Sequence, residues 1–358
     1  MSWRVAHQMT IYRSEDWYSA HPTILRGPDG SLLVFFHRSP VHGYSRHSHP
    51  LFDIRLCRST DEGVTWSRPQ FVTSDPRGGI LDFGAHCLPN DDIYIHGSTV
   101  ELVPEPSHPH AHWISKGGIP FWTRSSDHGR TWSDPVRFPQ LPDTTWGHPA
   151  SHSGVCRSGL LATPDGRLLL PGKSTCHPEG VMPFFGMMQC SMDMGETWQY
   201  EGPIAQDDTA HFSEPAIAMT PAGRIMVLFR CHPHSRNTSQ ELYLAYVESN
   251  DGGKTWSSWR PTTIHGCPGH ILTLKDGRLF VTVGTRWPGQ QGCLARVLTP
   301  EGEDLNTAPD MVIRGDSFDP DCGYPWSVEL NNGKVLVIYY YVYENGVRGI
   351  EGTIVEDV

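Results

Sequence analysis

The amino-acid sequence predicts an all-β protein folded as a six-bladed β-propeller with four-stranded antiparallel blades. Three observations favour this architecture: an octapeptide that occurs four times, six hairpin turns spread along the chain, and a last blade that is short of one strand. The repeated units follow one another at intervals of about 55–70 residues, which is typical of propeller blades. We therefore expect residues 1–358 to form a single propeller domain.

The octapeptide has the pattern S-x-D-x-G-x-T-W, and we expect each copy to form the turn between the third and fourth strands of a blade. Its Asp can accept backbone N–H bonds within the turn, and its Gly supplies a position with positive φ. Its Trp offers a large apolar face for packing between blades. These are folding roles, so we expect the Asp residues to be structural. They are Asp61, Asp127, Asp193 and Asp251, with spacings of 66, 66 and 58 residues.

Six hairpin turns flanked by apolar runs predict the link between the first and second strands of each blade. The turns end at Gly30, Asp91, Gly166, Gly223, Gly277 and Gly333, and the strands that follow are Leu32–Phe36, Ile93–Ile95, Leu168–Leu170, Ile225–Phe229, Leu279–Val283 and Val335–Tyr340.

The last blade has only three obvious strands, of which the third is Gly349–Val355. We expect the N-terminal segment Trp3–Tyr12 to supply the fourth strand, because that pairing closes the ring and covers the sheet edge.

Composition excludes several classes of function. The formal net charge of −11 argues against a general binder of nucleic acids or anionic membranes, so neither partner is expected. The N-terminus lacks the apolar segment of a signal peptide, and the longest apolar stretch, near Val335–Tyr343, is too short to span a bilayer. The nine cysteines are scattered without a CxxC pair, which favours reduced thiols and a cytoplasmic location. The oligomeric state is left open.

The propeller register predicts which residues share the face opposite the octapeptide turns. Counting nine positions back from each hairpin gives the start of each first strand: His21, Asp82, Arg157, Glu214, Pro268 and Tyr324. A longer first strand in the third blade would bring His152 or His148 to this face in place of Arg157, and His270 is the nearest candidate in the fifth blade. The ends of the second strands add Arg38, Lys173, Arg230 and Arg286. Cationic side chains that gather at one end of the propeller axis of an acidic protein predict a pocket for an anion, most simply a carboxylate.

Two first-strand segments carry a resemblance to a known family. They read Ser-Glu214-Pro-Ala-Ile and Gly-Tyr324-Pro-Trp-Ser-Val-Glu-Leu. Together with the octapeptides, which are similar to Asp boxes, they resemble the sialidase (neuraminidase) superfamily over nearly the whole chain. The resemblance implies that Tyr324 is a nucleophile activated by Glu214 and that Arg230 binds a substrate carboxylate. A phenol with a pKa of about 10 is a weak nucleophile until a carboxylate takes its proton.

Two departures from the family pattern change the expected site. Ala20 occupies the position of an arginine that grips the substrate carboxylate in the family, so Arg38 and Arg286 are expected to join Arg230 in that task. The loop that carries the family's acid/base Asp contains histidines here, and His47 or His49 can serve as an acid or base near neutral pH.

The leading hypothesis is an exo-acting glycosidase that cleaves a terminal acidic sugar from a small glycan or glycoside. The expected catalytic residues are Tyr324, Glu214, His47 and His49. The expected substrate-binding residues are Arg38, Arg230, Arg286, His21, Asp82, His86, His148, His152 and His270.

Three alternatives remain open. A lyase acting on a uronic-acid glycoside could use a His and a Tyr to move protons, and it would leave an unsaturated product that absorbs in the near ultraviolet. A metal-dependent sugar enzyme could place three axial imidazoles around one ion, although no compact spacing such as HExxH is present. A non-catalytic glycan-binding propeller is the third alternative. No cofactor is expected, and the axis could accept a metal ion.

Overall fold

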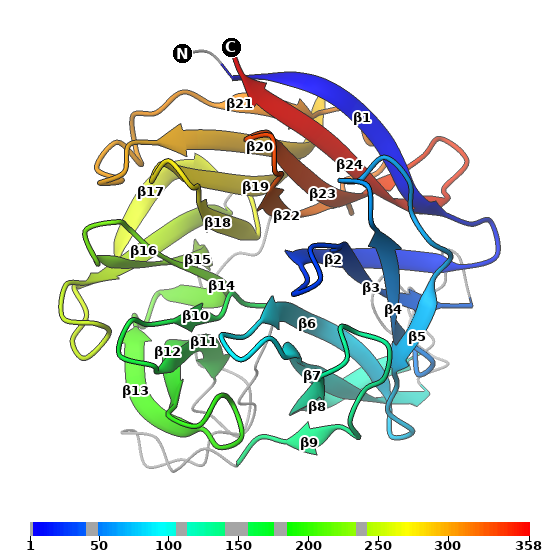
Figure 1. The fold of residues 1–358 in the computed structure, drawn as a ribbon, viewed down its shortest axis with the longest axis horizontal. Helices are drawn as coiled ribbons and strands as arrows, with labels where there is room; N and C mark the ends of the chain where they lie inside the picture. The colour runs from blue at the N-terminus through cyan, green and yellow to red at the C-terminus, as the bar shows by residue number, and fades with distance from the viewer. Residues whose placement is uncertain (1–2, 41–48, 105–112, 140–156, 175–184, 234–241) are drawn as a thin grey trace.

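The computed structural model describes residues 3–40, 49–104, 113–139, 157–174, 185–233 and 242–358. Within these residues every regular element is a β-strand, and the strands form six antiparallel sheets of four strands each. The sheets are arranged as blades around a common axis (Figure 1). The predicted fold class, an all-β six-bladed propeller, is confirmed.

Each blade runs outward from an inner strand near the axis to an outer strand at the rim (Figure 1). Blade one comprises β2 (Tyr18–Arg26), β3 (Leu32–Ser39), β4 (Asp53–Ser59) and β5 (Gln70–Thr73). Blade two comprises β6 (Gly79–Cys87), β7 (Ile93–Pro104), β8 (Trp113–Ser125) and β9 (Val136–Arg137). Blade three comprises β10 (Leu161–Ala162), β11 (Leu168–Ser174), β12 (Phe185–Ser191) and β13 (Gln199–Ala205).

The remaining blades follow the same order except at the chain ends. Blade four comprises β14 (Ala210–Met219), β15 (Ile225–Pro233), β16 (Tyr243–Ser249) and β17 (Arg260–His265). Blade five comprises β18 (Gly269–Thr273), β19 (Leu279–Trp287), β20 (Gln290–Leu298) and β21 (Met311–Arg314). Blade six comprises β22 (Gly323–Glu329), β23 (Val335–Val342), β24 (Arg348–Asp357) and, as its outer strand, β1 (Trp3–Arg13).

Blade six is completed by the first strand of the chain. β1 pairs antiparallel with β24 from Trp3↔Asp357 to Arg13↔Gly349, so the two ends of the described chain lie side by side (Figure 1). This is the pairing that the three-stranded last blade predicts.

The six hairpins between first and second strands lie where the sequence predicts them. The last residue of each turn has a positive φ, including the non-glycine Asp91 at 67°. Asp tolerates this left-handed conformation better than most residues because its short side chain bonds locally.

Blade three departs from the prediction of a longer first strand. Within the described residues β10 spans only Leu161–Ala162, and Arg157 lies outside it in irregular chain. His148 and His152 lie outside the described residues. The first strand of blade three is therefore shorter than predicted within the described residues, and the placement of His148 or His152 at this face stays a prediction.

The Asp-box turns are held together by their own side chains. Asp127 accepts hydrogen bonds from the backbone N–H groups of Arg130 and Thr131 at 3.0 and 2.8 Å, and from the Thr131 hydroxyl at 2.6 Å. The same turn places Trp132 edge-on against Phe35 of the neighbouring blade, with ring centroids 5.8 Å apart. This turn therefore caps blade two and contributes to its seam with blade one.

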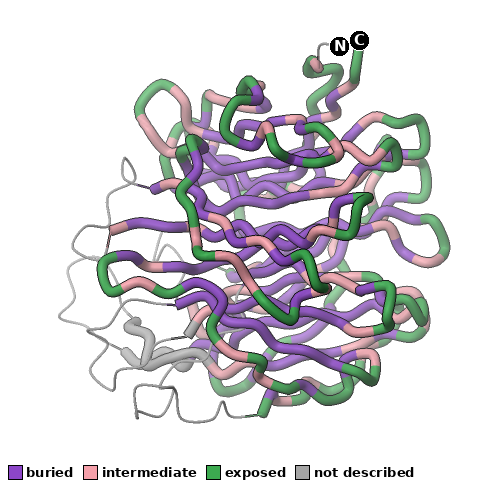
Figure 2. Tube along the Cα trace, turned by 90° about the vertical axis from the view of Figure 1, so that its left-hand side faces the viewer, coloured by how far each residue is buried: buried purple, intermediate pink, exposed green. Residues whose placement is uncertain are grey.

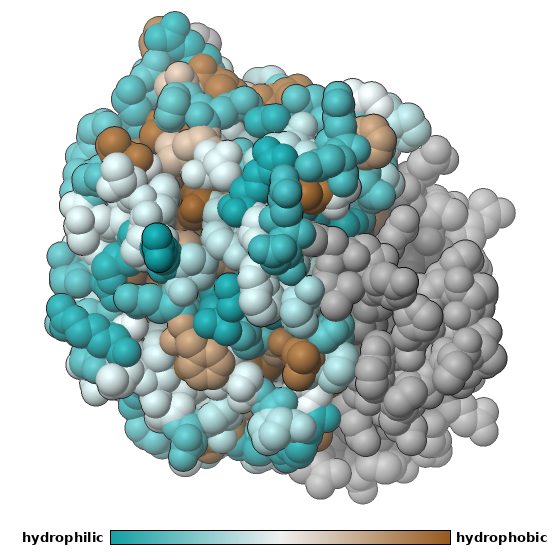
Figure 3. Space-filling model, turned by 90° about the vertical axis from the view of Figure 1, so that its right-hand side faces the viewer, coloured by the Kyte–Doolittle hydropathy of each residue, from teal (hydrophilic) through white to brown (hydrophobic). Residues whose placement is uncertain are grey.

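The apolar core lies mainly in the seams between blades. One cluster joins blades six and one through residues such as Tyr340, Ile338 and Phe36. Figure 2 shows buried residues along the strands and exposed residues in the turns. The flank drawn in Figure 3 is largely hydrophilic, with hydrophobic residues scattered over it.

The described cysteines are free thiols, and all but Cys87 are buried. The part of the chain that the structure describes contains no helix long and apolar enough to cross a membrane.

Candidate active site

Tyr324 and Glu214 meet near the axis, on the face opposite the Asp boxes. Tyr324 is the second residue of β22 and Glu214 lies in the first half of β14, in blades six and four. The Tyr324 hydroxyl donates a 2.5 Å hydrogen bond to Glu214 Oε1, and each residue is 5% exposed. The predicted encounter of the two side chains is confirmed, whereas their catalytic roles remain predictions.

A shared backbone feature directs these side chains. Tyr324, Glu214 and His21 all have left-handed backbones, with φ of 53°, 45° and 49°. Each precedes a proline and sits at a register shift between the first and second strands of its blade. A residue before proline normally adopts an extended conformation, so a left-handed one is strained by about 1–3 kcal/mol. The surrounding sheet must hold that strain, which is a common property of functional sites.

Charge around Glu214 keeps its carboxylate ionised. Burial alone would raise its pKa, but the guanidinium of Arg230, the ammonium of Lys173 and the hydrogen bond from Tyr324 outweigh burial and lower the pKa to about 2. Arg230 Nη1 donates to Glu214 Oε2 at 2.9 Å. Both carboxylate oxygens are therefore engaged, one by a phenol and one by a guanidinium.

The phenol of Tyr324 holds its proton in the free protein. Burial raises its pKa well above the ordinary value, and the nearby negative charge of Glu214 raises it further, against the opposing effects of Arg230 and Arg286. The site is thus poised with the proton on Tyr324 and the negative charge on Glu214.

The Tyr324 ring is packed between other rings and cations. His21 stacks on it with centroids 4.0 Å apart and an interplanar angle of 13°. The guanidinium carbons of Arg157 and Arg286 lie 5.3 and 5.4 Å from its centroid. Asp82 Oδ1 lies 3.8 Å from His21 Nδ1, so the first strands of blades one, two and six converge here.

A second network behind Tyr324 escaped the sequence analysis. Asp321 accepts hydrogen bonds from the Tyr340 hydroxyl at 2.7 Å and from Arg348 Nη2 at 3.1 Å. Arg286 donates to the Tyr340 hydroxyl at 3.3 Å. The network fixes the orientation of Arg286, whose pKa stays raised despite its burial because Tyr340 and other acidic groups surround it.

The predicted cations differ in how they relate to this centre. Arg230 and Arg286 both approach Tyr324 or its partner Glu214. The guanidinium of Arg38 instead lies over the Trp17 ring, 4.0 Å from its centroid. The part predicted for Arg38 in holding a substrate carboxylate stays a prediction.

The histidines divide into several groups. His49 accepts a 3.1 Å bond from the Leu51 N–H through Nδ1, and burial lowers its pKa. A neutral His49 therefore carries its proton on Nε2, the nitrogen that remains for proton transfer. His47 lies outside the described residues.

His86 and His270 lie deeper along the axis. Both line a cavity of about 540 Å³, together with Trp326 and hairpin residues of the Asp-box face. Burial lowers the pKa of His86 to about 3 and that of His270 well below its ordinary value. Among the described residues no three His, Cys, Asp or Glu side chains form a group that could hold a metal ion.

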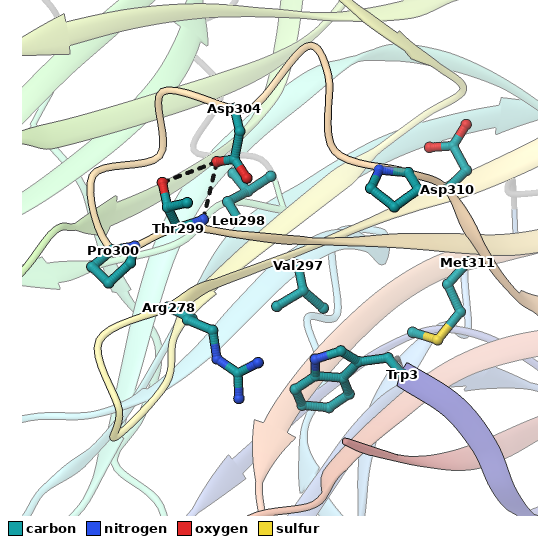
Figure 4. A pocket seen from close by; sticks show the side chains of 10 residues that line it. Trp3, Arg278, Val297, Leu298, Thr299, Pro300, Asp304, Asp310 and Met311 are labelled. Atoms are coloured by element: carbon teal, nitrogen blue, oxygen red, sulfur yellow. Dashed lines mark hydrogen bonds between the residues drawn. The ribbon is translucent and has the colours of Figure 1, made fainter. Parts of the chain in front are cut away.

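A further hollow, of about 550 Å³, opens at the seam between blades five and six, and Figure 4 shows its lining. Trp3 and Arg278 lie on one side of it, and Asp304 on the other bonds to Thr299 of its own turn. The lining contains none of the predicted site residues.

Known proteins resemble this chain in sequence and in fold. The model of the BNR repeat-like domain matches residues 106–337. A sialidase from Paraclostridium sordellii is 25% identical over 297 residues, which cover 75% of this chain and 68% of that protein.

Two solved structures extend the comparison to the whole ring. A protein of unknown function from Dyadobacter fermentans superposes with a TM-score of 0.87 and 27% identity, covering 99% of both chains. The NanB sialidase from Streptococcus pneumoniae superposes with a TM-score of 0.68 and 15% identity, covering 98% of this chain and 70% of that one. At that identity the second likeness concerns the fold alone.

Proposed function

Because the chain belongs to the BNR repeat-like domain family of sialidase-type propellers, we propose that it is an exo-acting glycoside hydrolase for a terminal acidic sugar on a small glycan or glycoside. The observation that carries this proposal is the buried 2.5 Å hydrogen bond between the Tyr324 hydroxyl and Glu214. A phenol and a carboxylate in this relation can act as a nucleophile and its base.

The reaction has two proton-balanced steps. In the first, Tyr324 Oη attacks the anomeric carbon and passes its proton to Glu214, while the departing aglycone oxygen takes a proton from a histidine acid. In the second, water attacks the same carbon and gives its proton to that histidine, and Tyr324 leaves with the proton held by Glu214. His49 is the acid candidate within the described residues, and His47 is the candidate outside them.

Arg230 links substrate binding to this proton transfer. In the free protein its guanidinium donates to Glu214 and helps to hold the Glu214 pKa at about 2, which makes Glu214 a weak base. A substrate carboxylate that shares Arg230 removes part of this stabilisation and makes Glu214 more basic. An acidic sugar therefore prepares the site for its own cleavage, and a neutral sugar does not.

Arg286 is the second arginine of the proposed carboxylate clamp. Its orientation is fixed by Tyr340, and its guanidinium carbon lies 5.4 Å from the Tyr324 ring centroid. With Ala20 at the position of the family's arginine, Arg38 is the third member of the proposed clamp.

A panel of aryl glycosides of acidic sugars, each matched with its neutral analogue, tests the proposal. We expect release of the aryl alcohol from at least one acidic member, together with a free sugar whose mass includes one added water. Sugar binding without turnover across the panel would contradict the proposal. An unsaturated sugar that absorbs in the near ultraviolet would also contradict it, since elimination adds no water.

A further inference from the structure

Arg157 is a fully buried cation beneath the proposed nucleophile. It is 1% exposed, and its guanidinium carbon lies 5.3 Å from the Tyr324 ring centroid and 4.7 Å from that of Trp326. Within the described residues no carboxylate forms a salt bridge with it, and its Nε has no hydrogen-bond acceptor. Burial of a guanidinium is costly, so the contacts that Arg157 makes with the described residues indicate its task.

The hydrogen bonds of Arg157 indicate that task. Its Nη2 donates to the carbonyl oxygens of Tyr324 and Pro325 at 3.1 and 2.5 Å. These two residues lie within the register shift of β22, between the pairs Gly323↔Tyr340 and Trp326↔Ile338, so the sheet ladder skips them. One guanidinium nitrogen thus satisfies both carbonyls of the strained segment that directs the Tyr324 side chain.

The segment of residues 157–159, which carries Arg157, also supports Glu214. The Gly159 N–H donates to the carbonyl oxygen of Pro215 at 3.2 Å, inside the equivalent register shift of β14. A Cβ on Gly159 would lie 3.0 Å from the Ile217 nitrogen, so the two backbones approach closely because this residue is glycine. Residues 157–159 of blade three therefore contact both left-handed segments, the one in blade four and the one in blade six.

We propose that Arg157 is a positioning residue that, with the Gly159 amide, sets the distance and orientation between Tyr324 and Glu214. Arg157 does not touch the substrate and acts through the Tyr324–Pro325 backbone. Its positive charge also favours the phenolate that forms when Tyr324 gives up its proton. Burial lowers the pKa of Arg157 to about 10, so the guanidinium remains charged at neutral pH.

The test is a substitution series at this position. The inference rests on the proposed hydrolase function for its kinetic arm. Arg157→Met removes both the charge and the hydrogen bonds, and we expect kcat to fall about 100-fold with KM within about twofold of the wild type. Arg157→Lys keeps a positive charge and hydrogen-bond donors, so it should restore at least part of the loss. Arg157→Gln keeps donors without charge and separates the two contributions.

Arg296→Met is the matched control. Arg296 is also buried, at 7% exposed, and donates to a backbone carbonyl, that of Leu305, at 2.8 Å, but its other described partners are Thr263 and Asp310 of blades four and five. The Arg296→Met variant should have a lower melting temperature than the wild type but an unchanged kcat per folded molecule. A kcat of Arg157→Met equal to that of this control would overturn the positioning role.

A crystal structure of Arg157→Met provides a readout that needs no substrate. We expect the left-handed backbone at Tyr324 to relax and the 2.5 Å contact with Glu214 to lengthen. An unchanged contact would overturn the inference even if the wild type hydrolysed every substrate offered. Conversely, if the wild type hydrolysed none, the proposed function would fail while this structural test would still decide the role of Arg157. If Arg157→Met does not fold, Arg157→Gln decides by the same structural readout.

Discussion

The Tyr324 hydroxyl lies 2.5 Å from Glu214 Oε1, although the two residues are 110 positions apart and belong to blades six and four. Arg230 holds the other oxygen of the same carboxylate. A proton can therefore move between Tyr324 and Glu214 without any rearrangement of the ring, while Arg230 controls how readily Glu214 accepts it.

The first prediction concerns this pair. Tyr324→Phe removes the attacking oxygen but keeps the packing of the ring against His21, and Glu214→Gln removes the group that takes the proton. Each should reduce kcat to near background with little loss of stability. Because the two residues act as a unit, the double mutant should cost little more than either single mutant.

Tyr339→Phe is the control for the lost hydroxyl. Tyr339 is a fully buried tyrosine of the same blade, and its hydroxyl bonds to Thr353 at 2.7 Å rather than to site residues. It should leave kcat unchanged. Full activity of Tyr324→Phe on a substrate that the wild type cleaves would exclude Tyr324 as the nucleophile.

The second prediction concerns Arg230→Ala. Loss of the guanidinium should raise KM strongly for carboxylated substrates and much less for their neutral analogues. It should also raise the pKa of Glu214, which Arg230 helps to hold at about 2. The ionised carboxylate is the active form, so activity is lost as the pH falls through its pKa. The acid limb of kcat/KM should therefore move to higher pH in the variant, and an unmoved acid limb would contradict the proposed coupling.

The third prediction concerns the Asp boxes. Asp127→Ala removes the acceptor for several turn hydrogen bonds and should lower the free energy of unfolding by about 1–2 kcal/mol, with kcat per folded molecule near normal.

The stabilising effect of Asp127 should also depend on pH. The hydrogen bonds from Thr131 hold the pKa of Asp127 below its ordinary value. Its stabilising effect is therefore complete above pH 3.8 and is lost at lower pH, as the carboxylate gains its proton in the folded state. Denaturant titrations at neutral and acid pH measure this difference, which should shrink towards acid. Loss of activity at an unchanged melting temperature would show a functional turn.

The fourth prediction concerns metal ions. Since no three potential ligands gather in the described part of the chain, we expect activity to survive a chelator. Elemental analysis of the purified protein before and after chelation measures the metal content directly. A stoichiometric metal whose removal abolishes turnover would favour the metal-dependent alternative.

The sequence predicted the blades and the central pair because both leave periodic signals. Hairpins and Asp boxes depend on local residues, and counting back from each hairpin identified Glu214 and Tyr324. The role of Arg157 was missed because its bonds to residues 324 and 325 reach from blade three to blade six, across 167 and 168 positions, and no local pattern encodes them. Asp321 was missed for a related reason, since its buried partners Tyr340 and Arg348 follow it in chain order but meet it only when blade six is folded.

The pairing of β1 with β24 has a consequence for how the protein is made. Thr10 on β1 hydrogen-bonds to Glu351 on β24, 341 residues later in the chain. At a synthesis rate of roughly 5–20 residues per second, β1 leaves the ribosome about 20–70 s before its partner exists. During that interval its edge is unpaired, and a β24 emerging on a neighbouring chain presents the same register. Domain swapping of β1 between two nascent chains is therefore the misassembly expected for a ring closed by β1 and β24. Closely spaced ribosomes on one mRNA would favour this exchange.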